Sequence, residues 1–302
     1  MIVTVTLNPA LRVGYEAERV SRGAANEVSR VSYRAGGRGL AVAKVLHTFG
    51  HEVVAAGLVG GSSGEVIRDE LARAGVATQF TRINGESRRI LEITDAADGT
   101  VTTFGEPAPF ITTEELGRLA ADYRALMADA TAAVLCGSLP DGLPAETYGS
   151  LASYAAEAGV PVVLDASGSA LRHALSRRPA LVIPGDASGD PAAVTVPGPG
   201  TPAADGAAAL VADGAGAVAI LSGGGVRAVT AAGEWRAELA GQHLHRASRD
   251  AMVAGFVPGI ALAWSWPDIL AHVIALAASS DPAGDVDLEA YERLLPKVTV
   301  AP

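Results

Sequence analysis

Short β-branched runs alternate with Ala- and Leu-rich stretches of helical spacing along most of this chain, and this alternation leaves few folds open to it. Strands that alternate with helices are joined by right-handed crossovers, which build a mostly parallel sheet with helices on both faces. The strand-like runs are Ile2–Leu7, Val53–Val59, Ala132–Leu135, Val162–Leu164, Leu181–Ile183 and Val218–Leu221. The helical stretches are Gly39–Phe49, Glu65–Ala74, Thr147–Ala158 and Ala203–Ala212. The sequence therefore predicts an α/β fold around one buried sheet.

Two stretches, residues 12–34 and 86–104, interrupt the alternation because they have strand character without a helix between the strands. The second contains a turn at Ala97–Gly99, which predicts a hairpin. Inserts of this kind in an α/β domain usually form a small sheet that lies over the site as a lid. We therefore expect one domain over residues 1–302, with the two segments as its lid. The Pro- and Gly-rich stretch Gly185–Asp205 is predicted to be a loop.

Composition narrows the classes of partner. Apolar residues make up 49% of the 302 residues, which is enough for one large core. The formal net charge is -10 and the pI is about 5.1, and a nucleic-acid backbone requires a basic face. Nucleic acid is therefore not expected as the main partner, although an acidic protein can still contain a local basic pocket for a small anion.

The expected compartment is the cytoplasm. Cys136 is the single cysteine, so no internal disulfide is possible, and this fits a reducing environment. The N-terminus has no basic region and no long apolar run, so it has the character of a first strand and not of a signal peptide. The apolar stretch Val253–Trp264 is about half as long as a membrane span of roughly 20 residues. No membrane association is predicted.

Four segments together carry a resemblance to a known family. They read TLNPAL at Thr6–Leu11, AGGRGLAVAKVL at Ala35–Leu46, CGSLPDGLP at Cys136–Pro144 followed by VVLDASGSAL at Val162–Leu171, and RDAMVAGF at Arg249–Phe256. In this order and at this spacing they resemble the PfkB (ribokinase-like) carbohydrate kinases. The 1-phosphofructokinase and tagatose-6-phosphate kinase branch is the most similar. The resemblance runs over nearly the whole chain, and the set is specific although each motif alone is weak.

The resemblance implies a three-layer α/β/α domain with a β lid, a phosphosugar under the lid, and ATP with Mg²⁺ along the carboxyl ends of the strands. It implies that Asp250 is the catalytic base, which deprotonates the sugar hydroxyl. Backbone N–H groups of a GAGD loop stabilise the charge that moves onto the γ-phosphate. By the same resemblance, the substrate site contains Arg12, Gly36, Gly37, Arg38, Arg88 and Ser138. The nucleotide and phosphate loop contains Ser222, Gly224, Ala247, Ser248 and Arg249. A homodimer through the lid sheets is also implied, and it would cover the exposed lid edge.

The loop that corresponds to GAGD departs from the family's pattern. It reads Ala247-Ser248-Arg249-Asp250, so both glycines are absent. Glycine allows the backbone to approach a phosphate closely. The sequence predicts that the Arg249 side chain either occupies the γ-phosphate space or pairs with Asp250, and a pairing would lower the pKa of the base.

Other family motifs are altered as well. The family's GGKGxN contains Arg38 and Ala41 here, and the acidic position after TLNPAL is Arg12. The TRxN element keeps Arg88 without its Asn. The PNxxE element reads Pro184-Gly185-Asp186-Ala187-Ser188, without its Asn and Glu, and either Asp186 or Asp190 could replace the lost acid. The SxGxxG element is partly kept at Ser222–Arg227. These changes affect the motifs for sugar binding, for metal binding and for stabilisation of the transition state. Together they predict that kinase chemistry is no longer strictly required of this protein.

Simpler interpretations stand beside the functional ones. Asp250 is either the family's base or an ordinary first-turn carboxylate of a helix. Arg38 and Arg88 lie inside matching motifs, which favours a pocket role over a solvated surface role. Arg12, Arg89, Arg246 and Arg249 are singly typical of surface charges, yet together the six arginines predict an anion pocket. His243 and His245 share one side of a strand, but no third ligand for a metal is identifiable.

Three functions follow as hypotheses. The first is an ATP-dependent kinase of a phosphosugar with Asp250 as base and with impaired or altered activity. The second is a catalytically inactive homologue that acts as an anionic-ligand-binding or regulatory protein. The third is a different reaction in the same cleft, for which the sequence contains no direct sign.

Overall fold

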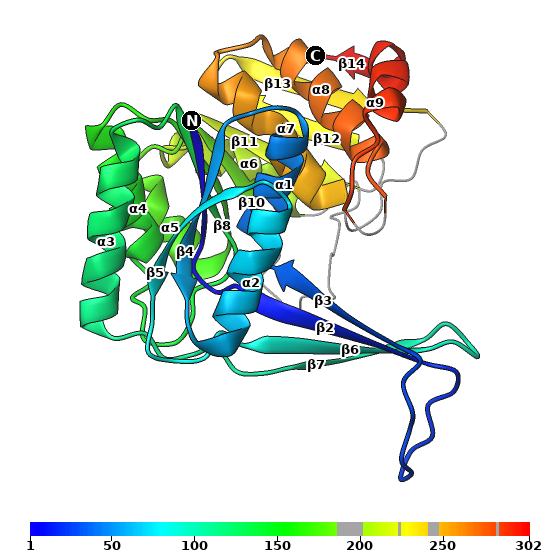
Figure 1. The fold of residues 1–302 in the computed structure, drawn as a ribbon. Helices are drawn as coiled ribbons and strands as arrows, with labels where there is room; N and C mark the ends of the chain where they lie inside the picture. The colour runs from blue at the N-terminus through cyan, green and yellow to red at the C-terminus, as the bar shows by residue number, and fades with distance from the viewer. Residues whose placement is uncertain (186–201, 223–224, 241–247, 282–283) are drawn as a thin grey trace.

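A ten-stranded sheet forms the centre of the protein in this computed structural model (Figure 1). Its strand order is β14-β13-β12-β11-β10-β9-β8-β1-β4-β5, and the strands from β11 to β5 are parallel. The strands β12, β13 and β14 extend the sheet antiparallel beyond β11. The bounds are β1 Ile2–Thr6, β4 Val53–Val59, β5 Ala77–Arg82, β8 Ala132–Cys136, β9 Val162–Ala166, β10 Leu181–Pro184, β11 Ala217–Ser222, β12 Gly225–Thr230, β13 Gly233–Glu238 and β14 Thr299–Ala301. The predicted α/β fold with a mostly parallel sheet is confirmed.

The structure describes residues 1–185, 202–222, 225–240, 248–281 and 284–302, and for residues 202–205 and 248 only the backbone is described. Most of the predicted loop Gly185–Asp205 lies outside these residues, and its last four residues belong to helix α6. Within the described part of the chain, none of the helices combines the length and the apolar character that crossing a bilayer requires.

Helices cover both faces of the large sheet, and each face has its own hydrophobic core. One face packs against α1 Arg38–Thr48, α2 Gly61–Arg73, α7 Ser248–Ala261 and α8 Trp266–Ala278. The other packs against α3 Thr113–Met127, α4 Thr147–Glu157, α5 Gly168–Leu175 and α6 Pro202–Ala212. Helix α9 Leu288–Leu294 and the 3₁₀ turn η1 Leu295–Lys297 lie against α8. This arrangement is the three-layer α/β/α architecture.

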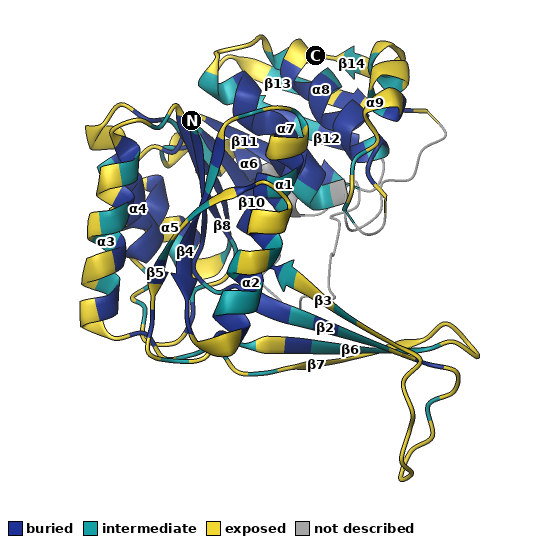
Figure 2. Cartoon of the chain, viewed as in Figure 1, coloured by how far each residue is buried: buried dark blue, intermediate teal, exposed yellow. Residues whose placement is uncertain are grey.

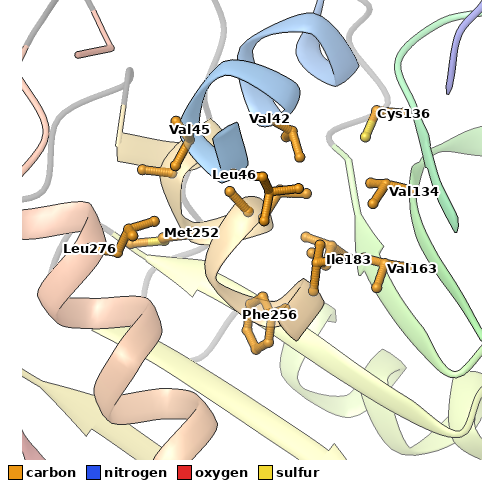
Figure 3. Close-up of a cluster of buried hydrophobic side chains, with 14 of the residues drawn as sticks. Val42, Val45, Leu46, Val134, Cys136, Val163, Ile183, Met252, Phe256 and Leu276 are labelled. Atoms are coloured by element: carbon orange, nitrogen blue, oxygen red, sulfur yellow. The ribbon is translucent and has the colours of Figure 1, made fainter. Parts of the chain in front are cut away.

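The core between α1, α7 and the sheet determines where both helices begin. Figure 3 shows side chains of α1, such as Leu46, facing Phe256 of α7 and the strand residues Val163 and Ile183. Each of these side chains is buried, and burial of this much apolar surface stabilises a domain strongly. Because α1 and α7 pack on neighbouring strands, their amino ends lie at the same edge of the sheet.

A second, four-stranded sheet projects from this body (Figure 1). We call it the lid sheet, and its strands are β2 Ala10–Ala17, β3 Arg30–Gly36, β6 Arg89–Asp95 and β7 Val101–Gly105. Strands β6 and β7 pair antiparallel, as the turn at Ala97–Gly99 predicts. The β2–β6 pair is parallel, so the lid sheet is mixed. Its far end is the most exposed part of the molecule (Figure 2).

Helix α2 begins earlier than the sequence predicts. The predicted helix is Glu65–Ala74, whereas α2 starts at Gly61. The carboxylate of Glu86 accepts hydrogen bonds from the backbone N–H groups of Ser62 (3.1 Å) and Ser63 (2.6 Å). These are among the first-turn N–H groups that a helix leaves without a partner. A distant acidic side chain therefore adds the extra turn.

Candidate active site

The candidate active site lies at the carboxyl ends of neighbouring strands of the large sheet. Thr6 of β1 is in register with Gly57 of β4 and with Cys136 of β8, and Cys136 is in register with Asp165 of β9. Residues in register on neighbouring strands project from the same face. Ligands of open parallel sheets bind at this edge. The buried Asp165 carboxylate, which belongs to this row of residues, therefore lies at the usual ligand position.

Arg38 and Arg249 both bind Asp165. The Nη1 atom of Arg38 donates to Oδ1 of Asp165 at 2.9 Å, and the Nη2 atom of Arg249 donates to the same oxygen at 3.0 Å. Asp165 is fully buried, so the two guanidinium groups compensate the high cost of placing a carboxylate there. The sequence-predicted site residues Arg38 and Arg249 are thus brought together.

Gly37 allows Arg38 to reach this position. It is the N-cap of α1 and has φ +139°, in the region that favours glycine. A Cβ atom at Gly37 would lie 2.7 Å from Cγ2 of Thr6, because the chain passes close to the end of β1. The sharp entry lets α1 start at Arg38 directly above the strand ends.

Asp250 lies in the first turn of α7, next to Arg249. Burial raises the pKa of the Asp250 carboxyl to about 6, and the positive charges of Arg38, Arg249 and Arg12 oppose this shift without cancelling it. The negative charge of Asp165 adds to the increase. Four charged side chains therefore act on Asp250 from the sheet, from two helices and from the lid sheet.

The predicted pairing of Arg249 with Asp250 requires a correction, although the charge of Arg249 does act to lower the pKa of Asp250. The sequence predicts that a pairing of Arg249 with Asp250 would lower the pKa of the base. The hydrogen bonds of Arg249 go instead to Asp165 and, at 3.5 Å, to the carbonyl of Pro184. The pKa of Asp250 is raised, because its loss of solvation outweighs the arginine charges. Asp250 therefore keeps the basicity that a proton acceptor needs near neutral pH.

The lid sheet contributes two more arginines. Nη2 of Arg12 lies 3.0 Å from Oε1 of Glu92. Arg88 immediately precedes β6, and its carbonyl accepts a hydrogen bond from the N–H of Leu11. Burial and the nearby charge of Arg12 both lower the pKa of Arg88, and its buried Nε atom has no hydrogen-bond partner. Two like charges thus lie close together at the base of the lid sheet.

Gly36 lies where β3 pairs with β2. A Cβ atom there would lie 2.8 Å from Cγ of Arg12, so a larger residue would displace this arginine. Gly36 therefore belongs to the arrangement that positions Arg12.

The other predicted site residues either make separate hydrogen bonds or lie outside the described residues. The hydroxyl of Ser138, just beyond β8, accepts a hydrogen bond from Nδ2 of Asn8 at 3.1 Å. The hydroxyl of Ser222, the last residue of β11, donates to the carbonyl of Gly225, the first residue of β12, at 2.9 Å. Ser248 is described only as the first backbone residue of α7. Gly224, Ala247, Asp186, Asp190, Arg246, His243 and His245 lie outside the described residues.

Asp165 and Glu92 were not among the predicted site residues. A signal for Asp165 was present, because it directly follows the predicted strand Val162–Leu164 and is the one charged residue of β9. A charge in a buried strand requires a partner. Glu92 has no such signal, because it lies in a half-exposed strand.

The described residues of the site offer few metal ligands. Among the described residues, no group of three or more His, Cys, Asp or Glu side chains could hold a metal ion. Asp165 Oδ2 is buried and has no hydrogen-bond partner, so one carboxylate oxygen remains unused. Magnesium that arrives on nucleotide phosphates needs only one or two protein carboxylates. Asp165 could therefore supply one carboxylate ligand to such an ion.

Comparison with known proteins shows which families and relatives this chain is similar to. The profile described as the pfkB family of carbohydrate kinases matches residues 10–228. A tagatose-6-phosphate kinase of Staphylococcus epidermidis is 34% identical over 175 residues, which are 58% of this chain and 56% of that protein. A second one from the same species is 33% identical over 61% of this chain and 59% of that protein. The matched segments thus span less than two thirds of these curated relatives.

Solved structures match over nearly the whole chain. A Thermotoga maritima protein described as a possible 1-phosphofructokinase is 24% identical, with a TM-score of 0.82, over 100% of this chain and 99% of the other. Phosphofructokinase-2 from Escherichia coli in complex with fructose-6-phosphate is 21% identical, with a TM-score of 0.84, over 98% of both chains. At these identities the structures establish the ribokinase-like fold alone. With the profile match over more than half of its length, the chain belongs to the pfkB family of carbohydrate kinases.

Proposed function

We propose that the protein transfers the γ-phosphoryl group of ATP to a hydroxyl group of a sugar phosphate, with Asp250 as the general base. The observation that supports this most is the position of Asp250 beside Arg38, Arg249 and Arg12 at the carboxyl edge of the sheet. A carboxylate with a pKa of about 6 is ionised at neutral pH and still basic enough to accept a proton. The surrounding cations suit the phosphate groups of both substrates.

The two arginines at the base of the lid sheet bind the phosphate that the sugar already carries. Arg88 has a buried Nε donor without a partner, and Arg12 lies close enough to lower the pKa of Arg88. An anion between two such guanidinium groups relieves their repulsion and satisfies donors that burial leaves unpaired. ATP lies along the strand ends, and Mg²⁺ arrives on its phosphates with Asp165 and Asp250 as the described carboxylates within the site.

A second candidate is a protein that binds a sugar phosphate and has no turnover. The arginine pair Arg12 and Arg88 supports it, because two nearby guanidinium groups can bind an anion without ATP. Arg249, which replaces a glycine of the family's motif beside Asp250, also supports a binding protein without turnover. The two candidates differ in whether the nucleotide binds.

Thermal denaturation with separate ligands tests both candidates. Mg²⁺–ATP, Mg²⁺–ADP, tagatose 6-phosphate and fructose 6-phosphate are each added at saturating concentration. A ligand at one hundred times its Kd adds about 2.7 kcal/mol to the stability of the folded protein, which gives a measurable rise of the midpoint. The kinase predicts a rise with nucleotide and with a sugar phosphate, and ADP formation when both are present.

Each pattern of midpoints has a defined meaning. A rise with sugar phosphates and none with nucleotides contradicts the kinase and supports the binding protein. Absence of any rise contradicts both. Inorganic sulfate at matched ionic strength is the control for an unspecific charge effect.

We further propose a homodimer that forms through the lid sheet. A row of side chains runs across one face of this sheet from Tyr33 through Val13 and Leu91 to Phe104, in register. Tyr33 is 58% exposed and Phe104 is 57% exposed. A hollow of about 400 Å³ beside them is lined largely by apolar side chains of the same face, including Tyr15. Exposed apolar patches of this kind usually mark an interface.

The variant Tyr33→Asp tests the dimer, because a charge in an apolar interface is costly to bury. We expect the wild type to sediment as a dimer and the variant to sediment as a monomer. The exposed Ser150→Asp on α4, outside the lid sheet, is the matched control for added charge. A monomeric wild type at micromolar concentration contradicts the proposal.

A further inference from the structure

The Asp165 carboxylate fixes two guanidinium groups at one point. Both Arg38 and Arg249 donate to its Oδ1 atom, at 2.9 and 3.0 Å, although they come from the beginnings of different helices. Asp165 belongs to a strand in the middle of the sheet and has no exposed surface. A buried carboxylate on a rigid strand holds its partners with little freedom. The two cations therefore have defined positions before any ligand arrives.

This point carries more positive charge than one carboxylate neutralises. Arg38 and Arg249 bring two positive charges to one oxygen of Asp165, and Asp250 is the second carboxylate whose charge interacts with theirs. Each guanidinium group has five N–H donors, and the hydrogen bonds described here use one or two of them. The Nε atom of Arg249 is buried without a partner. An anion with several oxygen atoms would use the remaining donors.

The beginnings of the two helices increase the preference for an anion at this point. Arg38 is the first residue of α1, and Arg249 is the second residue of α7. The first-turn N–H groups of a helix have no partner inside the helix, and they carry partial positive charge. The side chain of Arg249 is only 15% exposed, so water screens its charge little.

We propose that Arg249 is a catalytic residue that binds the transferred phosphoryl group, and that Asp165 is the positioning residue that holds it there. This inference rests on the proposed kinase function and assigns the group that stabilises its transition state. In the reaction, the sugar hydroxyl oxygen forms a bond to the γ-phosphorus of ATP, and its proton passes to Asp250. The bond from the γ-phosphorus to the bridging oxygen breaks, and the electron pair leaves with ADP.

The charge on the transferred group explains why a guanidinium is suited to this role. During transfer, negative charge is spread over the three equatorial oxygens of the phosphoryl group. The guanidinium group of arginine is planar, remains charged, and donates two parallel hydrogen bonds to such oxygens. Because Asp165 holds Arg249, the donors are oriented before the reaction, and preorganised donors of this kind stabilise a transition state strongly.

An inhibitory role and a catalytic role for Arg249 predict opposite effects of its mutation on turnover. If the side chain filled the space of the γ-phosphate, removing it would raise turnover. If it stabilises the transferred group, removing it lowers turnover. The contact with Asp165 supports the second role, because it directs the guanidinium toward the sheet and leaves Asp250 without that hydrogen bond.

The test compares Arg249→Met, Arg249→Lys and Arg249→Gly with the wild type, using ATP and the sugar phosphate that gives turnover. We expect Arg249→Met to lower kcat about 100- to 1,000-fold, with a much smaller change in the KM of the sugar phosphate. Arg249→Lys keeps the charge and should recover part of the loss. Calorimetry with Mg²⁺–ADP and aluminium fluoride should show a matching loss of affinity for this imitation of the transferred group.

Asp165→Asn tests the positioning role. It should lower kcat, and Arg249→Met should cost much less in this background than alone, because the two residues act together. The pH dependence of kcat/KM should keep its Asp250 limb in Arg249→Met. The control is Arg118→Met on the opposite face of the sheet, where the arginine pairs with Glu114 at 2.8 Å and turnover should stay unchanged. Thermal midpoints of all variants establish that they fold.

Failure of this role is distinguishable from failure of the kinase proposal. If the wild type turns over and folded Arg249→Met or Arg249→Gly equals or exceeds it, the role of Arg249 is overturned and the kinase remains. If the wild type neither turns over nor binds Mg²⁺–ADP, the kinase is overturned and the role of Arg249 with it.

Discussion

Replacing Asp250 by asparagine is expected to lower kcat about 1,000-fold, within the range that a general base contributes. Asparagine keeps the size of the side chain and cannot accept the proton of the sugar hydroxyl. Asp250 is the carboxylate in the first turn of α7, and it lies within the influence of Arg38, Arg249 and Arg12. A coupled assay of ADP formation measures the loss.

The pH dependence of the wild type provides a second measurement of the same group. Burial raises the pKa of Asp250 from its usual value near 3.8 to about 6. The base must be ionised, so kcat/KM of the wild type should rise with pH up to about 6 and level off above it. The same shift has the opposite effect on folding. The raised pKa of Asp250 stabilises the folded protein fully at pH values below the pKa that Asp250 has in the unfolded chain. This stabilisation is lost as pH rises through about 6. Asp250→Asn should therefore be at least as stable as the wild type at neutral pH.

Asp268 provides the matched control. It is also an aspartate in the first turn of a helix, α8, and its Oδ2 accepts a hydrogen bond from the hydroxyl of Ser265 at 2.5 Å. Asp268→Asn should leave turnover unchanged. Turnover of Asp250→Asn within about threefold of the wild type would contradict the role of Asp250, because loss of a general base costs far more.

Replacing Gly57 by alanine is expected to destabilise the protein by about 4 kcal/mol or more, a size reserved for changes that the backbone cannot absorb. Gly57 has φ +139°, and a Cβ atom there would lie 1.9 Å from the carbonyl oxygen of Thr6. Both residues are on strands in the interior of the sheet, where β4 pairs with β1 and β5. Neither strand can move without breaking its backbone hydrogen bonds to the strand on its other side.

Gly50→Ala is the control for the backbone conformation alone. Gly50 has φ +76° and no atom within 4 Å of the position of a Cβ, so alanine there should cost about 1–2 kcal/mol. Urea denaturation of the two variants separates the clash from the conformational cost. Equal midpoints for Gly57→Ala and Gly50→Ala would show that the sheet accommodates the extra methyl group. Gly57 lies in the same row as Thr6 and Asp165, so a displaced β4 would also disturb the site.

Much of the fold could be predicted because its signals are local. The strand Val53–Val59 has the predicted bounds, and α1 and α4 agree within one residue at each end. Helix α3 was not among the predicted helices, although Thr112 and Glu115 form a capping box that marks its start. The start of α2 had no local signal, because its first N–H groups are satisfied by Glu86 from a distant loop.

The candidate site was predictable in part. Arg38, Arg88 and Asp250 lie in motifs whose order along the chain carries the family resemblance, and the family assignment is confirmed by the profile match. The partner of Arg249 was not predictable. The sequence offered Asp250, its immediate neighbour, whereas the structure pairs it with Asp165, 84 residues away. Proximity along the chain is a poor guide here, because consecutive helical residues do not face each other.

The alternation of strands and helices, the family, and the presence of a carboxylate at the head of an Ala- and Val-rich helix follow from the sequence by itself, because each depends on nearby residues or on the order of motifs. Only the tertiary structure decided the electrostatics around that carboxylate. It brings Asp165 between Arg38 and Arg249, and it buries Asp250 enough to raise the pKa of its carboxyl and not lower it. The reason is that pKa and ion pairing depend on which charges share a poorly solvated volume, and the chain acquires that volume only when β1, β8, β9, α1 and α7 pack together.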